Sequence, residues 1–457
     1  MSINSKSDPN TPHILLVNPW IHDFAAYDVW AKPYGLLSLA AILRDHGVRV
    51  TYIDCLDRFH ARMPAADPHA RHGRGPYLKT PIAKPAALKT IPRTYSRYGI
   101  LPEWLHDDLS ALEFAPDLIL VTSLMTYWYP GVFETIAVLK DRFPAVPLVL
   151  GGIYARLWTA HARRHSRADQ VITDRGDSLL AIVKAYTGYE VAPRFDLLNL
   201  DALPPPAFDL QRCINYIPLL TSRGCPFDCA YCASRLLEPA LRRQSPQRVL
   251  SEIVHWHDRY GVRDFVFYDD ALLVGSQQHA LPLLEGIIRL QRPLFFHTPN
   301  AFHIRAITAE TARLMYRAGF HTLRLGLETT DFDSRSELDH KVSEDEFERA
   351  VGHLRSAGFS QEQIGAYLLT GLPGQDLKGV QRSIRMVRNQ GITPVPAYYT
   401  PIPHTPLWEK AVAHSRYDLE ADPIFSNNTI MPCQKEEYSW KIMSNLKELA
   451  RKEPSAQ

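Results

Sequence analysis

The chain has few cysteines, no long hydrophobic run and no apolar leader. Only 6 of its 457 residues are cysteine, too few for a disulfide framework in a chain of this length. The longest apolar runs, residues 118–125 and 146–153, are well short of the ~20 residues that cross a bilayer. Residues 1–11 are polar and lack a signal core. We therefore expect a cytoplasmic protein without a membrane span.

Charge of either sign is also not in excess. Lys and Arg number 51 against 49 Asp and Glu, a formal net charge of +2. This balance gives no general reason to expect nucleic acid as a partner, although a local basic groove is compatible with it. With 46% hydrophobic and 22% charged residues, the composition is that of a soluble enzyme. The length predicts two or three domains, each with a full core.

Residues 12–190 alternate short apolar runs with amphipathic helix patterns. Helix patterns cover residues 34–46 and 132–143. Apolar runs of strand length cover residues 13–18, 48–53, 117–122 and 146–150. Apolar strands separated by helices predict a parallel sheet covered on both faces. We expect a doubly wound, Rossmann-like α/β domain whose ligand lies beyond the carboxyl ends of the strands.

Two segments depart from this alternation. Residues 56–100 carry nine Lys and Arg against Asp57 and Asp67, with scattered prolines. We expect a structureless basic insertion, either a mobile surface loop or a cover over an anionic or large ligand. The cluster Pro204-Pro205-Pro206 marks residues 191–212 as a linker, because consecutive prolines stiffen the chain and cannot join a helix or a central strand.

Residues 213–401 form a second alternating array. Candidate strands begin near residues 217, 264, 293, 322, 364 and 393, with helix patterns between them. Six such units predict a partial (β/α)6 barrel of the TIM type, with its chemistry at the carboxyl ends of the strands. Residues 402–457 are Pro-rich and then helical. This helical C-terminal extension either shapes the substrate pocket or only closes the barrel end.

Three of the cysteines lie close together directly after the first strand of the second array. Cys225, Cys229 and Cys232 have the spacing C-x3-C-x2-C. Three thiolates on one loop suit a soft metal centre, either a zinc ion or an iron-sulfur cluster. A four-iron cluster would keep one iron free of protein thiolates. A zinc ion would need a fourth ligand, for which Cys213 is the only nearby thiol in the sequence.

This motif, with Tyr231 before the last cysteine, resembles the CxxxCx(aromatic)C loop of the radical S-adenosylmethionine (SAM) superfamily. The resemblance covers about residues 217–401. It implies that Cys225, Cys229 and Cys232 hold a 4Fe-4S cluster whose open iron binds the amino and carboxylate groups of SAM. Electron transfer from the cluster then cleaves SAM to methionine and a 5′-deoxyadenosyl radical.

Residues at the ends of later strands resemble SAM-binding positions of that family. The residues for which we expect SAM contacts are Tyr231, Asp269, Asp270, Asn300, Glu328 and Gly371. Paired carboxylates accept hydrogen bonds from a cationic amino group, and residues 371–375 resemble the glycine-containing turn beneath the adenine. Simpler interpretations stay open: a helix N-cap at Asp270, a surface glutamate at position 328 and an ordinary turn at 371–375.

The first array resembles the cobalamin-binding domain that precedes the barrel in one class of radical SAM enzymes. Residues 18–39, 122–126 and 150–152 carry this resemblance. Their glycines leave room for a nucleotide tail along the sheet edge. The resemblance implies cobalamin contacts from Asn18, Gly35, Ser123, Met125, Thr126, Tyr127, Gly151 and Gly152.

The axial-histidine motif of other cobalamin proteins is incomplete here. Mutases and methionine synthase carry DxHxxG after the first strand, whereas His22 lacks the companion Asp and Gly. We therefore expect an ordinary loop histidine at this position. The departure is compatible with cobalamin binding and also with a domain that has lost the cofactor. The aromatic residues 127–129 either face a corrin ring or pack into a core.

With both cofactors, the resemblance implies methyl transfer to an unactivated carbon of a small or lipid-like metabolite, the cofactors supplying the difficult chemistry. A radical rearrangement or cyclisation without methyl transfer is the alternative within catalysis. A non-catalytic iron-sulfur and cobalamin sensor is the alternative of another class. The expected protein partner is an electron donor such as flavodoxin or ferredoxin. Nucleic acid is not expected, because no RNA-binding appendage is evident.

Overall fold

The computed structural model describes residues 11–332, 335, 338–339, 342–434 and 440–451. The chain divides into two compact units, residues 1–214 and 215–457. Each unit is built around its own parallel sheet flanked by helices. The α/β fold class that the sequence predicts is confirmed.

The first unit contains a five-stranded parallel sheet in the order β3-β1-β6-β7-β8. Its strands are β1 (His13–Asn18), β3 (Arg49–Asp54), β6 (Leu118–Val121), β7 (Leu148–Leu150) and β8 (Gln170–Val171). Because β1 pairs with β3 on one side and with β6 on the other, the strand order reverses at β1. In doubly wound sheets, ligands bind at this reversal, beyond the carboxyl ends of the strands.

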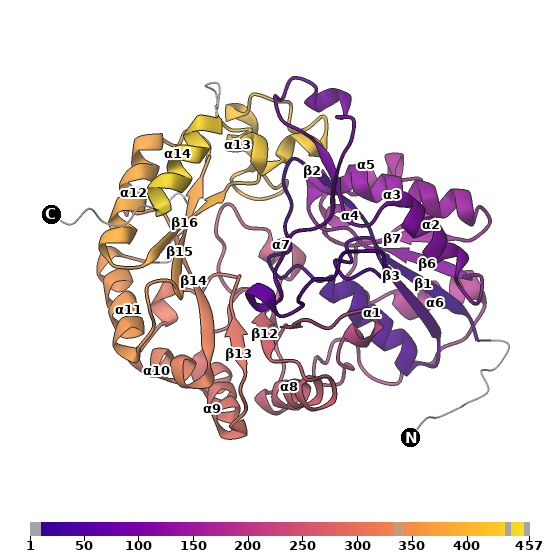
Figure 1. Ribbon diagram of the computed structural model, residues 1–457, viewed down its shortest axis with the longest axis horizontal. Coiled ribbons are helices and arrows are strands. Elements are labelled where there is room, and N and C mark those ends of the chain that lie inside the picture. The colour runs from indigo at the N-terminus through magenta and orange to yellow at the C-terminus, as the bar shows by residue number, and fades with distance from the viewer. Residues whose placement is uncertain (1–10, 333–334, 336–337, 340–341, 435–439, 452–457) are drawn as a thin grey trace. The chain divides into compact units, whose positions relative to one another are not determined.

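Helices cover both faces of this sheet, as predicted. Successive side chains of a strand point to opposite faces, so Ile14 and Leu16 pack with α1 (Tyr34–Asp45) and α6 (Leu179–Thr187). Leu15 and Val17 pack with the helices of the other face. Those helices are α2 (Pro102–Ser110), α3 (Tyr129–Arg142), α4 (Ile153–Leu157) and α5 (Thr159–His165). Figure 1 shows α2, α3 and α5 together on one side of the sheet and α1 on the other.

The basic insertion is not structureless, so this expectation is wrong. It contains β4 (Lys79–Pro81) and β5 (Ser96–Tyr98), which join β2 (Ile21–Asp23) in an antiparallel sheet of order β2-β5-β4. Ile21, Tyr77 and Tyr98 form a small core beneath this sheet. Strands of three residues are too short to display a period of two in the sequence, which is why the pattern missed them.

The proline-containing segment before the second unit packs against the first unit. The backbone N–H of Ala207 donates to the carbonyl of Leu37 over 3.0 Å. Partly buried apolar residues of this segment also contact the α1 core. They are Val191, Phe195, Leu197, Leu203 and Leu210. The segment that we expected as a linker is therefore in contact with the first sheet's helical layer along much of its length.

The second unit contains a six-stranded parallel sheet in the order β16-β15-β14-β13-β12-β9. Its strands are β9 (Ile217–Leu219), β12 (Asp264–Phe267), β13 (Phe295–His297), β14 (Phe320–Glu328), β15 (Ile364–Thr370) and β16 (Thr393–Tyr398). The connecting helices are α8 (Pro246–Tyr260), α9 (Ala280–Leu290), α10 (Ala309–Ala318), α11 (Glu344–Ala357) and α12 (Leu377–Asn389). Figure 1 shows a curved sheet with α9 to α12 along its outer side. This is the predicted partial (β/α)6 barrel.

Local sequence signals explain where these helices begin. Capping boxes at Thr308 and Ser343 start α10 and α11, with the side chain of each cap residue accepting from the backbone three residues later. Ser245 caps α8 in the same way, and Pro246 occupies its first turn. Because α10 begins at Ala309 and α11 at Glu344, while β13 ends at His297 and β14 at Glu328, long connections follow the carboxyl ends of these strands.

The C-terminal segment adds α13 (Trp408–His414) and α14 (Trp440–Arg451) to the second unit. Leu407 and Ala411 pack with Leu372, Tyr399 and Cys433. Cys433 is buried, and burial raises the pKa of its thiol to about 12. Within the described part of the chain, no helix combines the length and apolarity that crossing a membrane requires.

Candidate cluster and cofactor sites

The three clustered cysteines lie on a loop that is closed at its base. The strand β10 (Ser222–Arg223) pairs antiparallel with β11 (Arg242–Arg243), and the N–H of Gln244 donates to the carbonyl of Thr221 over 2.8 Å. Gly224 has a φ of 86°, and a Cβ there would lie 2.6 Å from the carbonyl oxygen of Ala240. Only glycine fits both the conformation and the space. We call residues 224–241 the cysteine loop.

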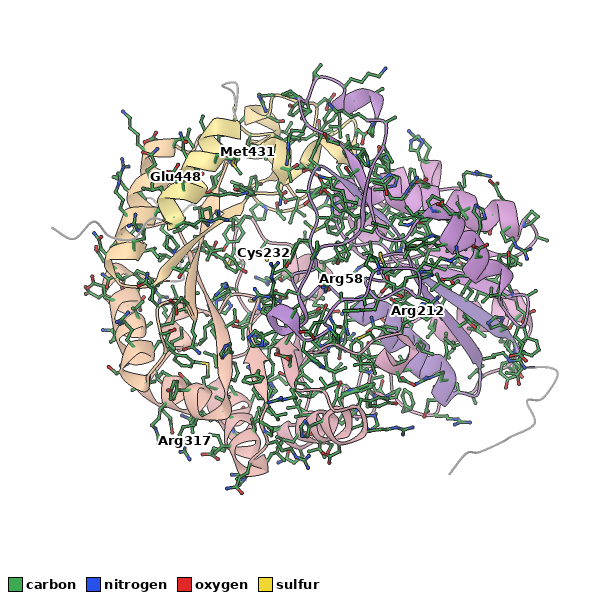
Figure 2. All side chains as sticks on the ribbon, in the orientation of Figure 1. Arg58, Arg212, Cys232, Arg317, Met431 and Glu448 are labelled. Carbon is green, nitrogen blue, oxygen red and sulfur yellow. The ribbon has the colours of Figure 1, made fainter. Side chains whose placement is uncertain are left out.

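The cysteines of the cysteine loop form no disulfide, and one of them accepts a hydrogen bond from the backbone. Cys225, Cys229 and Cys232 form no disulfide, and Cys229 is buried. The N–H of Ser234, at the start of α7 (Ser234–Leu237), donates to Sγ of Cys232 over 3.4 Å. Figure 2 shows Cys232 on the side of the sheet away from α10 to α12.

A neighbouring segment holds the middle of the cysteine loop. The N–H of Ala230 donates to the carbonyl of Leu338 over 2.8 Å, and the N–H of Leu407 donates to the carbonyl of Ala230 over 2.9 Å. Arg335, which the sequence did not single out, is 3% exposed and pairs with Asp339 over 2.7 Å. This buried pair fixes the stretch that contacts Ala230.

Asp269 holds the base of the cysteine loop. Its Oδ1 accepts hydrogen bonds from the hydroxyls of Thr221 (2.7 Å) and Ser222 (2.6 Å), and its Oδ2 accepts one from the N–H of Thr221 (3.2 Å). Oγ1 of Thr221 also lies 2.7 Å from Nε2 of His279. Burial raises the pKa of Asp269 to about 6 against the opposing hydrogen bonds, and burial lowers the pKa of His279 to about 4. A direct contact of Asp269 with SAM stays a prediction.

Asp270, Asn300 and Gly371 lie at the ends of different strands. Asp270 is half-buried and is not a helix N-cap, because α9 starts only at Ala280. Nδ2 of Asn300 donates to the carbonyl of Tyr268 over 2.6 Å. Gly371 has a φ of 91°, and its N–H donates to Oε1 of Gln375 over 2.8 Å. The glycine-containing turn is thus closed by the side chain of Gln375.

Glu328 is not a surface glutamate. It is 7% exposed and has a φ of 61° at a register shift where β14 ends. A left-handed conformation is strained for a residue other than glycine, and such strain gathers at functional sites. Burial, followed by the charge of Glu328, raises the pKa of Tyr231 well above its ordinary value. Tyr231 and Glu328 are therefore close neighbours, and their contact with SAM stays a prediction.

His303 is a residue near the cysteines that the sequence did not indicate. Its Nε2 lies 3.5 Å from Sγ of Cys225, and its ring centroid lies 4.2 Å from that of Phe227. The two contacts join residues about eighty positions apart in the chain. No local pattern reports such a contact.

In the first unit, three predicted cobalamin residues meet at the ends of β6 and β7. The hydroxyl of Ser123 donates to the carbonyl of Gly151 over 2.7 Å. Gly152 has a φ of 96°, and a Cβ there would lie 2.2 Å from the carbonyl oxygen of Ser123. A Cβ on Gly151 would meet no atom within 4 Å. The backbone of this edge is therefore open at Gly151 and tightly packed at Gly152.

The other predicted cobalamin residues differ in exposure. Nδ2 of Asn18 donates to Oδ1 of Asp54 over 2.7 Å, and burial raises the pKa of Asp54 to about 6. Gly35 is exposed in the first turn of α1, and Met125 is half-buried. Thr126 and Tyr127 are 4% and 3% exposed.

His22 lies on β2 beside a carboxylate. Its Nε2 is 2.7 Å from Oε2 of Glu134. Burial raises the pKa of Glu134, but the contacts with His22 and Arg97 outweigh it and lower that pKa to about 2. The geometry explains His22 as one member of a polar group, with Glu134 and Arg97, that ties β2 to α3.

Sequence comparisons agree with this architecture. Residues 219–387 match the Radical SAM superfamily. An uncharacterized methyltransferase of Pyrococcus horikoshii is 26% identical over 349 residues, which are 69% of this chain and 74% of the relative. The hopanoid C-2 methylase of Rhodopseudomonas palustris is 30% identical over 145 residues, which are 30% of this chain and 27% of that enzyme.

Structural comparisons extend the similarity to both units. One similar structure is the radical SAM methyltransferase TsrM from Kitasatospora setae, solved with tryptophan substrate and a SAM analogue. The TM-score is 0.65 and the sequence identity is 16%, and the match covers 96% of this chain and 89% of TsrM. A second similar structure is the cobalamin-dependent SAM radical enzyme OxsB, solved with aqua-cobalamin and SAM. The TM-score is 0.57 and the sequence identity is 14%, and the match covers 96% of this chain and 61% of OxsB. Residues 219–387 therefore match the radical SAM superfamily, and the chain shares the fold of cobalamin-dependent radical SAM enzymes.

Proposed function

We propose that this protein is a cobalamin-dependent radical SAM methyltransferase acting on an unactivated carbon of a small or lipid-like metabolite. The cysteine loop carries the proposal. It presents three cysteines that form no disulfide directly after the first strand of the unit that matches the radical SAM superfamily, on a backbone that requires glycine at position 224. The family match favours an iron-sulfur cluster over a zinc ion for these thiols.

Cys225, Cys229 and Cys232 are the residues that would hold the 4Fe-4S cluster, which supplies the electron for SAM cleavage when it is bound. The remaining chain positions these ligands. Asp269 fixes the loop base, and the N–H of Ser234 points at Cys232.

The proposed SAM contacts are Tyr231, Asp269, Asp270, Asn300, Glu328 and Gly371. Glu328 has the strongest support, because its strained backbone directs a buried carboxylate toward Tyr231. A carboxylate there can accept hydrogen bonds from the ribose hydroxyls or the amino group of SAM. Asp270 is half-buried beside the strand end and is available for the same role.

The proposed cobalamin site is the carboxyl edge of the first sheet, with Asn18, Gly35, Ser123, Met125, Thr126, Tyr127, Gly151 and Gly152 as contacts. The open space over Gly151 fits a bulky ligand that approaches the backbone. Cobalamin, when bound, carries the methyl group. The solved relative OxsB contains cobalamin on a similar fold, which supports this assignment.

The substrate class rests on the methyltransferase relatives. The hopanoid methylase acts on a lipid, and the cytidylyl-2-hydroxyethylphosphonate methyltransferase of Streptomyces wedmorensis acts on a small polar molecule. Both modify metabolites. We therefore propose a small or lipid-like metabolite as the substrate. The proposed electron donor is flavodoxin or ferredoxin.

The test is anaerobic reconstitution with iron, sulfide and cobalamin, followed by SAM and a strong reductant. We expect 5′-deoxyadenosine that disappears in Cys225→Ala, and cobalamin that stays with the protein after desalting. SAM with a deuterated methyl group, incubated with lipid and small-molecule extracts, should yield a product three mass units heavier than the unlabelled one. Zinc in place of iron, or a cluster without any 5′-deoxyadenosine, would contradict the proposal. Product without deuterium would favour rearrangement or cyclisation.

A further inference from the structure

His303 is held rigidly beside the cysteine loop. The N–H of the preceding Phe302 donates to the carbonyl of Arg324 over 2.7 Å, and the N–H of Gly326 donates to the carbonyl of Phe302 over 3.0 Å. These two bonds bridge the segment to β14. Because the backbone on one side of His303 is fixed to a central strand, its imidazole has a defined direction.

The imidazole reaches the cysteine loop through two independent contacts. Nε2 lies 3.5 Å from Sγ of Cys225, within the range of an N–H···S hydrogen bond. The ring also packs on Phe227 with an interplanar angle of 42°. Phe227 lies two residues beyond Cys225 on the same loop. The imidazole thus contacts two residues of the cysteine loop, and His303 is only 8% exposed.

We propose that His303 is a positioning residue of the cluster, whose Nε2–H donates a hydrogen bond to the sulfur of Cys225 and makes the cluster easier to reduce. The inference rests on the proposed function, because it requires a cluster on the three cysteines. Reduction adds negative charge that is shared with the thiolate sulfurs. A hydrogen bond to one of them stabilises the reduced state more than the oxidised state and so raises the potential. Burial strengthens the effect, because little water competes for the sulfur.

The consequence is a balance between two requirements. A higher potential eases electron entry from a protein donor, whereas SAM cleavage needs a strongly reducing cluster. One N–H···S bond to one of three thiolates changes the reduction potential of the cluster only moderately. It leaves Cys232 with the hydrogen bond from the N–H of Ser234.

The experiment uses the full chain, reconstituted anaerobically, in three variants. His303→Phe keeps an aromatic ring on Phe227 but removes the donor. His303→Gln restores an N–H donor of similar reach. Phe227→Leu is the matched control, because it removes the aromatic partner and leaves the imidazole in place. The midpoint potential is measured by redox titration followed by electron paramagnetic resonance, together with the iron content of each protein.

We expect about a tenfold smaller equilibrium constant for one-electron reduction in His303→Phe, equivalent to about 59 mV more negative. His303→Gln should recover most of this difference, and Phe227→Leu should shift the potential less than His303→Phe. Equal potentials in the parent protein and His303→Phe would overturn the proposal while the cluster, and with it the proposed function, remained. A parent protein that assembles no cluster would overturn both.

Loss of iron in His303→Phe would not end the test. The variant His303→Asn then replaces His303→Phe in the test. The side chain of asparagine is one carbon shorter than that of glutamine, so its amide does not reach the sulfur. A potential in His303→Asn equal to that of the parent overturns the proposal, and one close to the value expected for His303→Phe supports it.

Discussion

Asp269 and His279 both contact the hydroxyl of Thr221, and their pKa values are shifted in opposite directions. Burial raises the pKa of the carboxyl from 3.8 to about 6 and lowers that of the imidazole from 6.5 to about 4. Both groups are therefore neutral near pH 5, where the unfolded chain would carry both charges. The base of the cysteine loop is consequently a neutral hydrogen-bonded network under mildly acidic conditions, built without an ion pair.

This arrangement predicts two opposite pH dependences of stability. Between about pH 4 and pH 6, folded Asp269 binds a proton that the unfolded chain releases, so its contribution to the free energy of unfolding falls as the pH rises. Folded His279 lacks a proton that the unfolded chain binds, so its contribution rises with pH. Each contribution changes by up to about 3 kcal/mol across this window. The two nearly cancel in the parent protein.

Single substitutions should separate the two contributions. Relative to the parent, Asp269→Asn should become more stable as the pH rises from 4 to 6, and His279→Gln should become less stable. Urea unfolding at half-unit pH steps measures the slope of the free energy of unfolding against pH. Altered hydrogen bonds lower this free energy by the same amount at every pH and so do not change the slope. Slopes parallel to that of the parent in both variants would show that neither group has a shifted pKa.

A pair of adjacent glycines tests the proposed cobalamin edge. Gly152→Ala places a Cβ 2.2 Å from the carbonyl of Ser123 in a backbone conformation reserved for glycine, and we expect a loss of about 2–4 kcal/mol in stability. Gly151→Ala meets no protein atom, so the free energy of unfolding should stay within about 0.5 kcal/mol of the parent. Equilibrium dialysis should show weaker cobalamin binding by Gly151→Ala. Parent-like binding would exclude the contact at Gly151.

Among the helices, α8 contains an ionisable group on its buried face. Glu252 is 3% exposed and shares that face with Val249, Ile253 and Trp256. Burial raises its pKa from 4.5 to about 7, although Arg248 and Trp256 act in the opposite direction. The charged form is thus disfavoured in the folded helix, and α8 is destabilised as the pH rises from 4.5 through 7.

Replacing this carboxyl with an amide should therefore stabilise the protein only above neutral pH. We expect Glu252→Gln to raise the free energy of unfolding by up to about 3 kcal/mol at pH 8 and to change it little at pH 4.5. Glu285→Gln on α9 is the control, because Glu285 is an exposed residue whose 3.8 Å ion pair with Arg289 contributes little. A gain of equal size at both pH values would assign the effect to packing.

The elements that the sequence predicted are those whose signal is local. Strands such as β12 and β15 begin at the predicted residues, because each is a continuous apolar run between clear helix caps. By contrast, β2 and β5 pair Ile21 with Tyr98 across most of the insertion, and no window of sequence contains both. The same distinction between local and long-range signals decides which site residues the sequence could indicate. Spacing alone identified the three cysteines, whereas the proximity of His303 and the backbone strain at Glu328 exist only after folding.

At the scale of the whole chain, the two proposed cofactor sites belong to separate folding units. All three proposed cluster ligands lie in residues 215–457, and all eight proposed cobalamin contacts lie in residues 1–214. Each unit has its own core, represented by Leu139 in the first and Leu354 in the second, both 0% exposed. Units with separate cores can unfold in separate transitions.

This division predicts selective stabilisation by cobalamin. At a concentration one hundred times its Kd, cobalamin should stabilise the unit that binds it by about 2.7 kcal/mol and leave the other unit unchanged. Anaerobic scanning calorimetry should resolve two transitions. Leu139→Ala and Leu354→Ala assign them, since each removes about 2–5 kcal/mol of core packing from one unit. Cobalamin should raise only the transition that Leu139→Ala lowers. A rise confined to the transition that Leu354→Ala lowers would place cobalamin on the second unit, and a single transition lowered by both variants would show that the two cores unfold as one.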